Sequence, residues 1–179
     1  EYRPPVYTFD QVELDIALDP ARTIVKSKIE VLPGKGFELG APLVLLGQEL
    51  EFVSLRINGE AHRHFELTPE TLTIHSLPKE GKEKFIVEII SVCVPEKNTS
   101  LMGLYVSNGN FFTQCEAEGF RKIAYFLDRP DVMARYRVTL RAIEERYPVL
   151  LSNGNLLKQE KLPNGWHSAT WEDPFPKPS

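Results

Sequence analysis

Residues 113–121 carry side chains that could do chemistry, because two carboxylates and an amide recur at every second position. In an extended chain the side chains alternate between two faces, so Gln114, Glu116 and Glu118 are predicted to share one face. A row of acceptors makes a poor core face, since a buried carboxylate is costly unless it is paired. The row suits either solvent or a cationic ligand, and spacing alone leaves both interpretations open.

The rest of the chain contains no self-contained active site of a common type. It lacks a His-Glu-x-x-His zinc motif, a Gly-x-Ser-x-Gly elbow and a P-loop. His62 and His64 are predicted to share a strand face, but no third ligand lies nearby, so an exposed pair is favoured over a metal site. Cys93 and Cys115 predict free buried thiols rather than a disulfide framework, which favours a reducing compartment.

Length and charge exclude several classes of protein. A chain of 179 residues fits one domain with a real core. A net charge of -4 and a pI near 5.6 argue against a general nucleic-acid binder, for which a basic face is expected. No apolar run is long enough to span a bilayer, so no membrane helix is predicted.

Alternating apolar residues and turn signals predict an all-β domain. Residues 9–18 and 23–31 alternate and form a predicted hairpin. Asn-Gly, the strongest short hairpin signal, occurs at positions 58, 108, 153 and 164, which indicates antiparallel pairing. Further strands are predicted at 43–46, 51–57, 65–67, 72–74, 85–94, 101–106, 111–116, 135–143, 147–151, 156–161 and 166–171.

Two further segments have a predicted role. Arg135, Arg137 and Arg141 share one strand face, which could bind phosphate, but the 25 acidic residues favour a salt-bridged face. Residues 172–179 contain three prolines and are predicted not to form a central strand. The domain is therefore expected to span residues 1–171, followed by a proline-rich linker at 172–179.

The sequence around residues 113–121 resembles the aminopeptidase N family, the zinc alanyl aminopeptidases of bacterial type. The similarity continues in Asn-Thr-Ser-Leu-Met-Gly-Leu-Tyr at 98–105 and in Tyr-Phe-Leu-Asp-Arg-Pro-Asp-Val at 125–132. Residues 150–155 and 171–178 resemble further landmarks in the same order, and Tyr-Arg-Pro-Pro at 2–5 resembles the family's start. The resemblance thus covers essentially the whole chain.

The resemblance implies an antiparallel, saddle-like β-sandwich that lies over the catalytic domain of a larger cytoplasmic enzyme. That catalytic domain, with its His-Glu-x-x-His zinc motif and Gly-Ala-Met-Glu-Asn-type motif, would begin after residue 179. The partners implied are this catalytic domain and peptide substrates with a free N-terminus. The chain alone is expected to bind no cofactor and to lack peptidase activity, with zinc held by the parent enzyme.

The resemblance also assigns roles to the residues of the opening segment. Glu116 would anchor the α-amine of the substrate, and Gln114 would line the same pocket. Glu118 would instead be a structural partner of Arg121 or Arg129. Gly119 is expected to let the loop turn back without a side-chain clash.

Two other functions compete with this one. The chain could be a free-standing β-sandwich interaction module, with Gln114 and Glu116 as a docking surface for a basic partner. It could also belong to the epoxide-hydrolysing branch of the family, although residues 113–119 fit the alanyl branch better. A domain excised from an enzyme is also expected to expose aromatic side chains such as Phe126 or Phe175.

Overall fold

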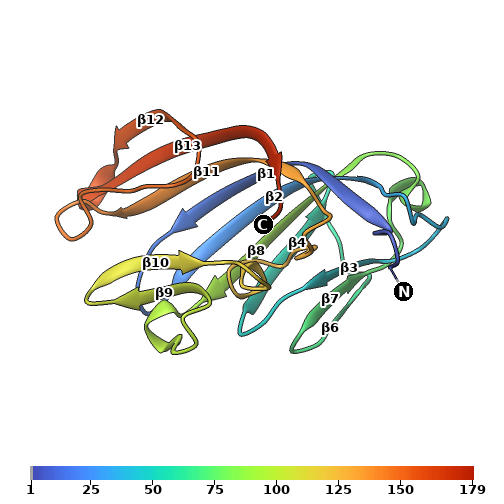
Figure 1. The fold of residues 1–179 in the computed structure, drawn as a ribbon, viewed down its shortest axis with the longest axis horizontal. Helices are drawn as coiled ribbons and strands as arrows, with labels where there is room; N and C mark the ends of the chain where they lie inside the picture. The colour runs from blue at the N-terminus through green and yellow to red at the C-terminus, as the bar shows by residue number, and fades with distance from the viewer. Residues whose placement is uncertain (1) are drawn as a thin grey trace.

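The computed structural model describes residues 2–179, and these form an all-β sandwich, as predicted. One sheet has eight strands in the order β12-β13-β11-β1-β2-β8-β4-β5, and two smaller sheets have the orders β10-β9 and β3-β7-β6. Figure 1 shows the two smaller sheets along the lower side of the long strands of the large sheet. The strands are β1 Tyr7–Ala17, β2 Thr23–Pro33, β3 Leu43–Leu46, β4 Glu51–Ile57, β5 Glu60–Ala61, β6 Phe65–Leu67, β7 Thr71–Ile74, β8 Phe85–Cys93, β9 Gly103–Ser107, β10 Asn110–Gln114, β11 Ala134–Ile143, β12 Asn155–Lys161 and β13 Trp166–Lys177.

Alternation of apolar and polar residues places one face of the large sheet in the core. In β1, Val12 is fully buried and Leu14 is 5% exposed, while Glu13 between them is partly exposed. The same core includes Leu43 and Leu45 of β3 and Leu72 of β7, so the three-stranded sheet packs against the large one. Burial of such side chains is the main favourable contribution to folding.

One strand pair departs from the antiparallel prediction. Strands β1 and β11 run parallel, with Gln11 opposite Arg135 and Ala17 opposite Arg141. Parallel neighbours need a long crossover connection, and here that connection contains both smaller sheets. The pairing brings the N-terminal hairpin beside the C-terminal meander.

Three of the four Asn-Gly pairs form the turns that the sequence predicts. Asn58, Asn108 and Asn164 all have positive φ, as do the glycines that follow them. At the fourth pair only Gly154 has a positive φ, and the predicted strand at residues 147–151 is irregular chain. A type I′ turn needs positive φ at both central residues, so this pair makes a different turn.

The proline-rich end of the chain continues β13 as an edge strand, which agrees with the prediction that it forms no central strand. Residues 172–177 continue β13, with Asp173 opposite Tyr136 and Lys177 opposite Ala134 of β11. Strand β12 pairs with β13 only as far as Glu172 of β13. Beyond this residue, β13 has a neighbouring strand, β11, on one side only. Proline has no N–H to donate, and it is tolerated at such an edge. A role as a linker to a further domain stays a prediction.

Two predicted exposed aromatics differ in outcome. Phe175 is 73% exposed, as expected, whereas Phe126 is fully buried, which corrects the prediction. The ring of Phe126 packs against Phe9 and Phe120 at centroid distances of 4.9 and 4.6 Å. Its backbone also exchanges hydrogen bonds with Leu46 at 2.8 and 2.9 Å, which holds the ring inside the sandwich.

The arginines of β11 form ion pairs, as predicted, on a partly exposed face of the large sheet. Each guanidinium contacts a carboxylate of a neighbouring strand. The pairs and their N···O distances are Arg135–Asp10 at 2.7 Å, Arg137–Glu172 at 2.6 Å and Arg141–Asp15 at 2.6 Å. Within residues 2–179, no helix combines the length and apolarity needed to cross a membrane.

Candidate functional site

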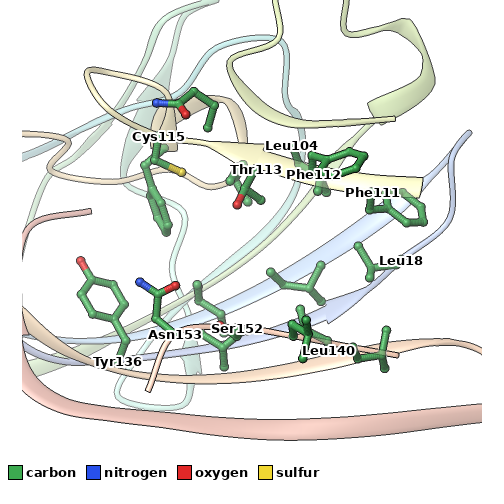
Figure 2. Close-up of a pocket in the computed structure, with 18 of the residues that line it drawn as sticks. Leu18, Leu104, Phe111, Phe112, Thr113, Cys115, Tyr136, Leu140, Ser152 and Asn153 are labelled. Carbon is green, nitrogen blue, oxygen red and sulfur yellow. The ribbon is translucent and has the colours of Figure 1, made fainter. Parts of the chain in front are cut away.

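A cleft of about 980 Å³ lies between the β9–β10 hairpin with its following loop and the sheet face of β1 and β11. Figure 2 shows Thr113 and Cys115 on one wall, with Tyr136 and Asn153 facing them from the other. Gln114 and Glu116 belong to the lining, as do Lys177 and Ser179 of the C-terminal segment. The two residues predicted to bind substrate are therefore brought to one cavity.

Gln114 is the last residue of β10, and its side chain supports the loop that follows. Its Nε2 donates a hydrogen bond to the backbone carbonyl of Glu116 at 2.8 Å. This bond uses the donor end of the amide, and within residues 2–179 the Oε1 atom receives no protein hydrogen bond. The amide can therefore offer its acceptor to a ligand at the cleft.

The predicted alternation of acceptors along a strand holds only as far as Gln114. Strand β10 ends there, and Gly119 N–H donates to the Cys115 carbonyl at 2.8 Å to close a turn. The Glu116–Ala117 peptide bond is cis, and Glu118 has a φ of 69°. The predicted common face for the three acceptors is therefore wrong, because a turn replaces the strand.

The carboxylates of this loop differ in their partners. Glu118 lies 3.6 Å from the Arg121 guanidinium, which confirms its predicted structural pairing. Glu116 is exposed, and among residues 2–179 its carboxylate has no ion-pair partner. A free anion at the mouth of a cleft is available to a cationic ligand.

Gly119 is required by close packing of the backbone. A Cβ at this position would lie 2.3 Å from the Gln114 carbonyl oxygen and 2.9 Å from Cys115 Cα. Its φ of -89° is accessible to any residue, so space rather than backbone conformation demands glycine. The prediction that Gly119 avoids a clash is confirmed.

Both thiols are free and poorly ionised. Burial, with smaller contributions from the negative charges of Asp128 and Glu116, raises the pKa of the Cys115 thiol from 9.0 to about 11. Burial raises the pKa of Cys93 to about 12. The thiolate is the nucleophile, so neither residue is suited to nucleophilic catalysis at neutral pH.

The raised pKa of Cys115 predicts slow modification of this thiol. In a Cys93→Ala variant at pH 8, we expect Cys115 to react with a thiol reagent about 100-fold more slowly in the folded chain than in urea, because its thiolate population falls by that factor. The rate is measured from the absorbance of the released reporter. Equal rates in the two states would show that burial does not suppress ionisation.

His62 contributes to loop structure through its ring nitrogen. His62 Nε2 lies 3.2 and 2.8 Å from the backbone carbonyl oxygens of His64 and His75, and neither His62 nor His64 is part of a strand. In the described range 2–179, no three His, Cys, Asp or Glu side chains are grouped so that they could hold a metal ion. His62 and His64 therefore do not fit a zinc site.

The opposite wall of the cleft was not found from the sequence. Tyr136, Leu140 and Asn153 line it, but they become neighbours of the 113–121 segment only through the parallel β1–β11 pairing. Asn153 belongs to an Asn-Gly pair and to the 150–155 landmark, but no motif or spacing indicates that Tyr136, Leu140 and Asn153 face residues 113–121. Asp128, whose carboxylate accepts a hydrogen bond from Arg121 of the loop at 2.9 Å, does lie in the 125–132 segment that resembles the family.

The chain is similar in sequence to a known protein family and to characterised relatives. Residues 42–179 match the peptidase M1 N-terminal domain family. The chain is 42% identical to aminopeptidase N of Haemophilus influenzae over 181 residues, covering 100% of this chain and 20% of that protein. It is 43% identical to aminopeptidase N of Escherichia coli K12, covering 99% of this chain and 20% of that protein.

Solved structures show the same fold. The aminopeptidase A of Legionella pneumophila, in complex with aspartic acid, matches with a TM-score of 0.92 and 38% identity over 100% of this chain and 21% of that one. An M1 zinc metallopeptidase of Deinococcus radiodurans matches with a TM-score of 0.82 and 17% identity over 96% and 40%, which supports the fold alone. The chain thus spans about a fifth of the length of the curated relatives that it matches.

Proposed function

Since the chain belongs to the peptidase M1 N-terminal domain family, as an N-terminal domain of the aminopeptidase N type, we propose that it serves a zinc aminopeptidase by anchoring the substrate. The anchored group is the free α-amine of a peptide, and the anchor is the carboxylate of Glu116. Gln114 lines the same subsite and accepts a hydrogen bond from the bound residue.

The observation that carries the proposal is the free carboxylate of Glu116 at the cleft. Other acidic side chains of the loop and the cleft are already paired: Asp128 with Arg121 at 2.9 Å, Glu118 with Arg121 at 3.6 Å, and Asp173 with Lys177. A free α-amine has a pKa near 8 and is mostly cationic at neutral pH. A fixed carboxylate binds such a group through a charge-assisted hydrogen bond.

An amine anchor also selects the bond that is cleaved. Holding the N-terminus at Glu116 sets the distance from the amine to the first peptide bond, so only that bond reaches a catalytic centre at a fixed position. The relative from Legionella pneumophila was solved with aspartic acid, a ligand that carries a free α-amine.

Zinc belongs to the parent enzyme in this proposal. The relative from Deinococcus radiodurans is a zinc metallopeptidase, but the 179 residues here contain no His-Glu-x-x-His, and residues 2–179 offer no metal-ligand group. We therefore assign the metal and the hydrolytic step to a catalytic domain outside this chain. A cytoplasmic location stays a prediction.

The function is tested by comparing this chain with the complete protein. We expect the complete protein to hydrolyse alanyl p-nitroanilide but not its N-acetyl derivative, because acetylation removes the cationic amine that Glu116 binds. Residues 1–179 alone are expected to show no hydrolysis and no stoichiometric zinc by elemental analysis. Equal hydrolysis of both substrates would contradict an amine anchor, and no hydrolysis by the complete protein would favour the free-standing interaction module.

A further inference from the structure

The loop that carries Glu116 is tied to the core by one buried ion pair. Arg121 Nε donates to Asp128 Oδ2 at 2.9 Å, and the two side chains are only 12% and 5% exposed. The backbone N–H of Arg121 donates to the same oxygen at 3.1 Å, and Arg121 Nη2 donates to the Asp128 backbone carbonyl at 3.2 Å. The other carboxylate oxygen accepts a hydrogen bond from the Ser179 hydroxyl at 3.0 Å.

The core side of this link is rigid. Asp128 follows Phe126, a fully buried residue whose backbone pairs with Leu46 of β3. Phe120, next to Arg121, is 8% exposed and packs on the Phe126 ring at 4.6 Å. A displacement of Asp128 would therefore require repacking of the sandwich, which makes it a fixed point for the loop.

The loop side of the link leads directly to the amine anchor. Four residues lie between Glu116 and Arg121, and the turn there is closed by the Gly119 to Cys115 hydrogen bond at 2.8 Å. The Arg121 carbonyl accepts a hydrogen bond from the Gln48 N–H at 2.8 Å. Both the backbone and the side chain of Arg121 are therefore fixed at the end of the turn. The position of Glu116 thus depends on the position of Arg121.

Stability alone does not account for a charged pair at this place. Replacing a buried ion pair by apolar side chains of similar volume is often neutral or stabilising, because desolvation offsets the attraction. A guanidinium fork that donates to both a carboxylate and a carbonyl does, however, define orientation, which an apolar contact does not. The pair is therefore suited to positioning.

We propose that Asp128, through Arg121, is a positioning residue for Glu116 in amine recognition, an inference that rests on the proposed function. Asp128 does not touch substrate in this role. It determines where the Glu116 carboxylate stands relative to the catalytic centre of the complete enzyme. Displacement of a positioned group by about 1 Å can lower a rate on the order of 100-fold.

The test is a double-mutant cycle on kcat/KM in the complete enzyme, with Asp128→Asn, Glu116→Gln and both changes together. Asparagine keeps the volume of Asp128 but weakens its bond to Arg121. Alone, Asp128→Asn is expected to lower kcat/KM about 10- to 100-fold, mainly by raising KM, since a displaced anchor weakens ground state and transition state alike. In the Glu116→Gln background the same change is expected to have no further effect.

Three outcomes separate the two proposals. Additive effects of the two changes, or no effect of Asp128→Asn alone, would overturn the positioning role while leaving the anchor intact. No effect of Glu116→Gln would overturn the proposed function itself.

Asp10→Asn, which breaks an exposed 2.7 Å pair with Arg135, is the control and is expected to leave kcat/KM unchanged. If Asp128→Asn does not fold, Arg121→Lys keeps the charge without the fork and enters the same cycle.

Discussion

Replacing Glu116 by Gln in the complete enzyme is expected to lower kcat/KM for alanyl p-nitroanilide on the order of 30- to 5,000-fold. The substitution keeps the shape and removes the charge. Loss of one partner of a desolvated charge pair costs about 2–5 kcal/mol, and each 1.36 kcal/mol corresponds to a factor of about ten in rate. Initial rates over a range of substrate concentrations give kcat and KM.

The fold is expected to survive this change. Glu116 is exposed, and its backbone carbonyl accepts the hydrogen bond from Gln114 Nε2 at 2.8 Å, a contact that the variant retains. Glu118→Gln is the matched control, because it removes the same charge from the same loop. Glu118 is 72% exposed and pairs with Arg121 at 3.6 Å, so its loss is expected to change kcat/KM by no more than about fivefold. A similar loss of kcat/KM in both variants would indicate that the overall negative electrostatic potential of the loop matters, rather than a specific anchor at Glu116.

Replacing Arg121 by Met is expected to destabilise the 179-residue chain by about 3–5 kcal/mol. The change removes the cation from a pair whose carboxylate is 5% exposed, and a buried charge left without its partner is strongly unfavourable. The Arg121 N–H and the Ser179 hydroxyl still donate to Asp128, but both are neutral donors. Urea denaturation followed by tryptophan fluorescence measures the free energy of unfolding.

Two companion variants make this result specific. Arg22→Met removes a pair with Glu51 whose side chains are 56% and 58% exposed, and it is expected to cost about 1 kcal/mol or less. The double change Arg121→Met with Asp128→Leu removes both charges and is expected to recover most of the lost stability. If the double variant is as unstable as Arg121→Met, packing of the arginine stem rather than the unpaired carboxylate explains the loss.

Local features of the chain could be predicted because short-range physics controls them. Alternation in residues 9–18 and 23–31 gives the β1–β2 hairpin with Val12 opposite Ile29. The Asn108-Gly109 turn gives the β9–β10 hairpin with Asn110 opposite Ser107, since both turn residues adopt positive φ. The membership of the chain in its family could be recognised for the same reason, because ordered motifs are visible in the sequence.

The candidate site could be predicted only in part. Gln114 and Glu116 do line one cleft, but the strand face assumed for them ends at Gln114. The turn that follows depends on the approach of Gly119 to the Gln114 carbonyl and on the bond from Arg121 to Asp128, and neither contact has a periodic signature. The role of Glu116 as an amine anchor remains a proposal.

The amino-acid order determined the strands, the hairpin turns and the residue types that could bind a cation. The tertiary structure alone decided which distant strands became neighbours, and with this the opposite wall of the cleft. The parallel β1–β11 pair, the burial of Phe126 and the extension of β13 through two prolines all depend on contacts between residues at least 35 positions apart in the chain. Turns and alternation act over a few residues, whereas such pairings are selected by the apolar area that the whole sandwich buries.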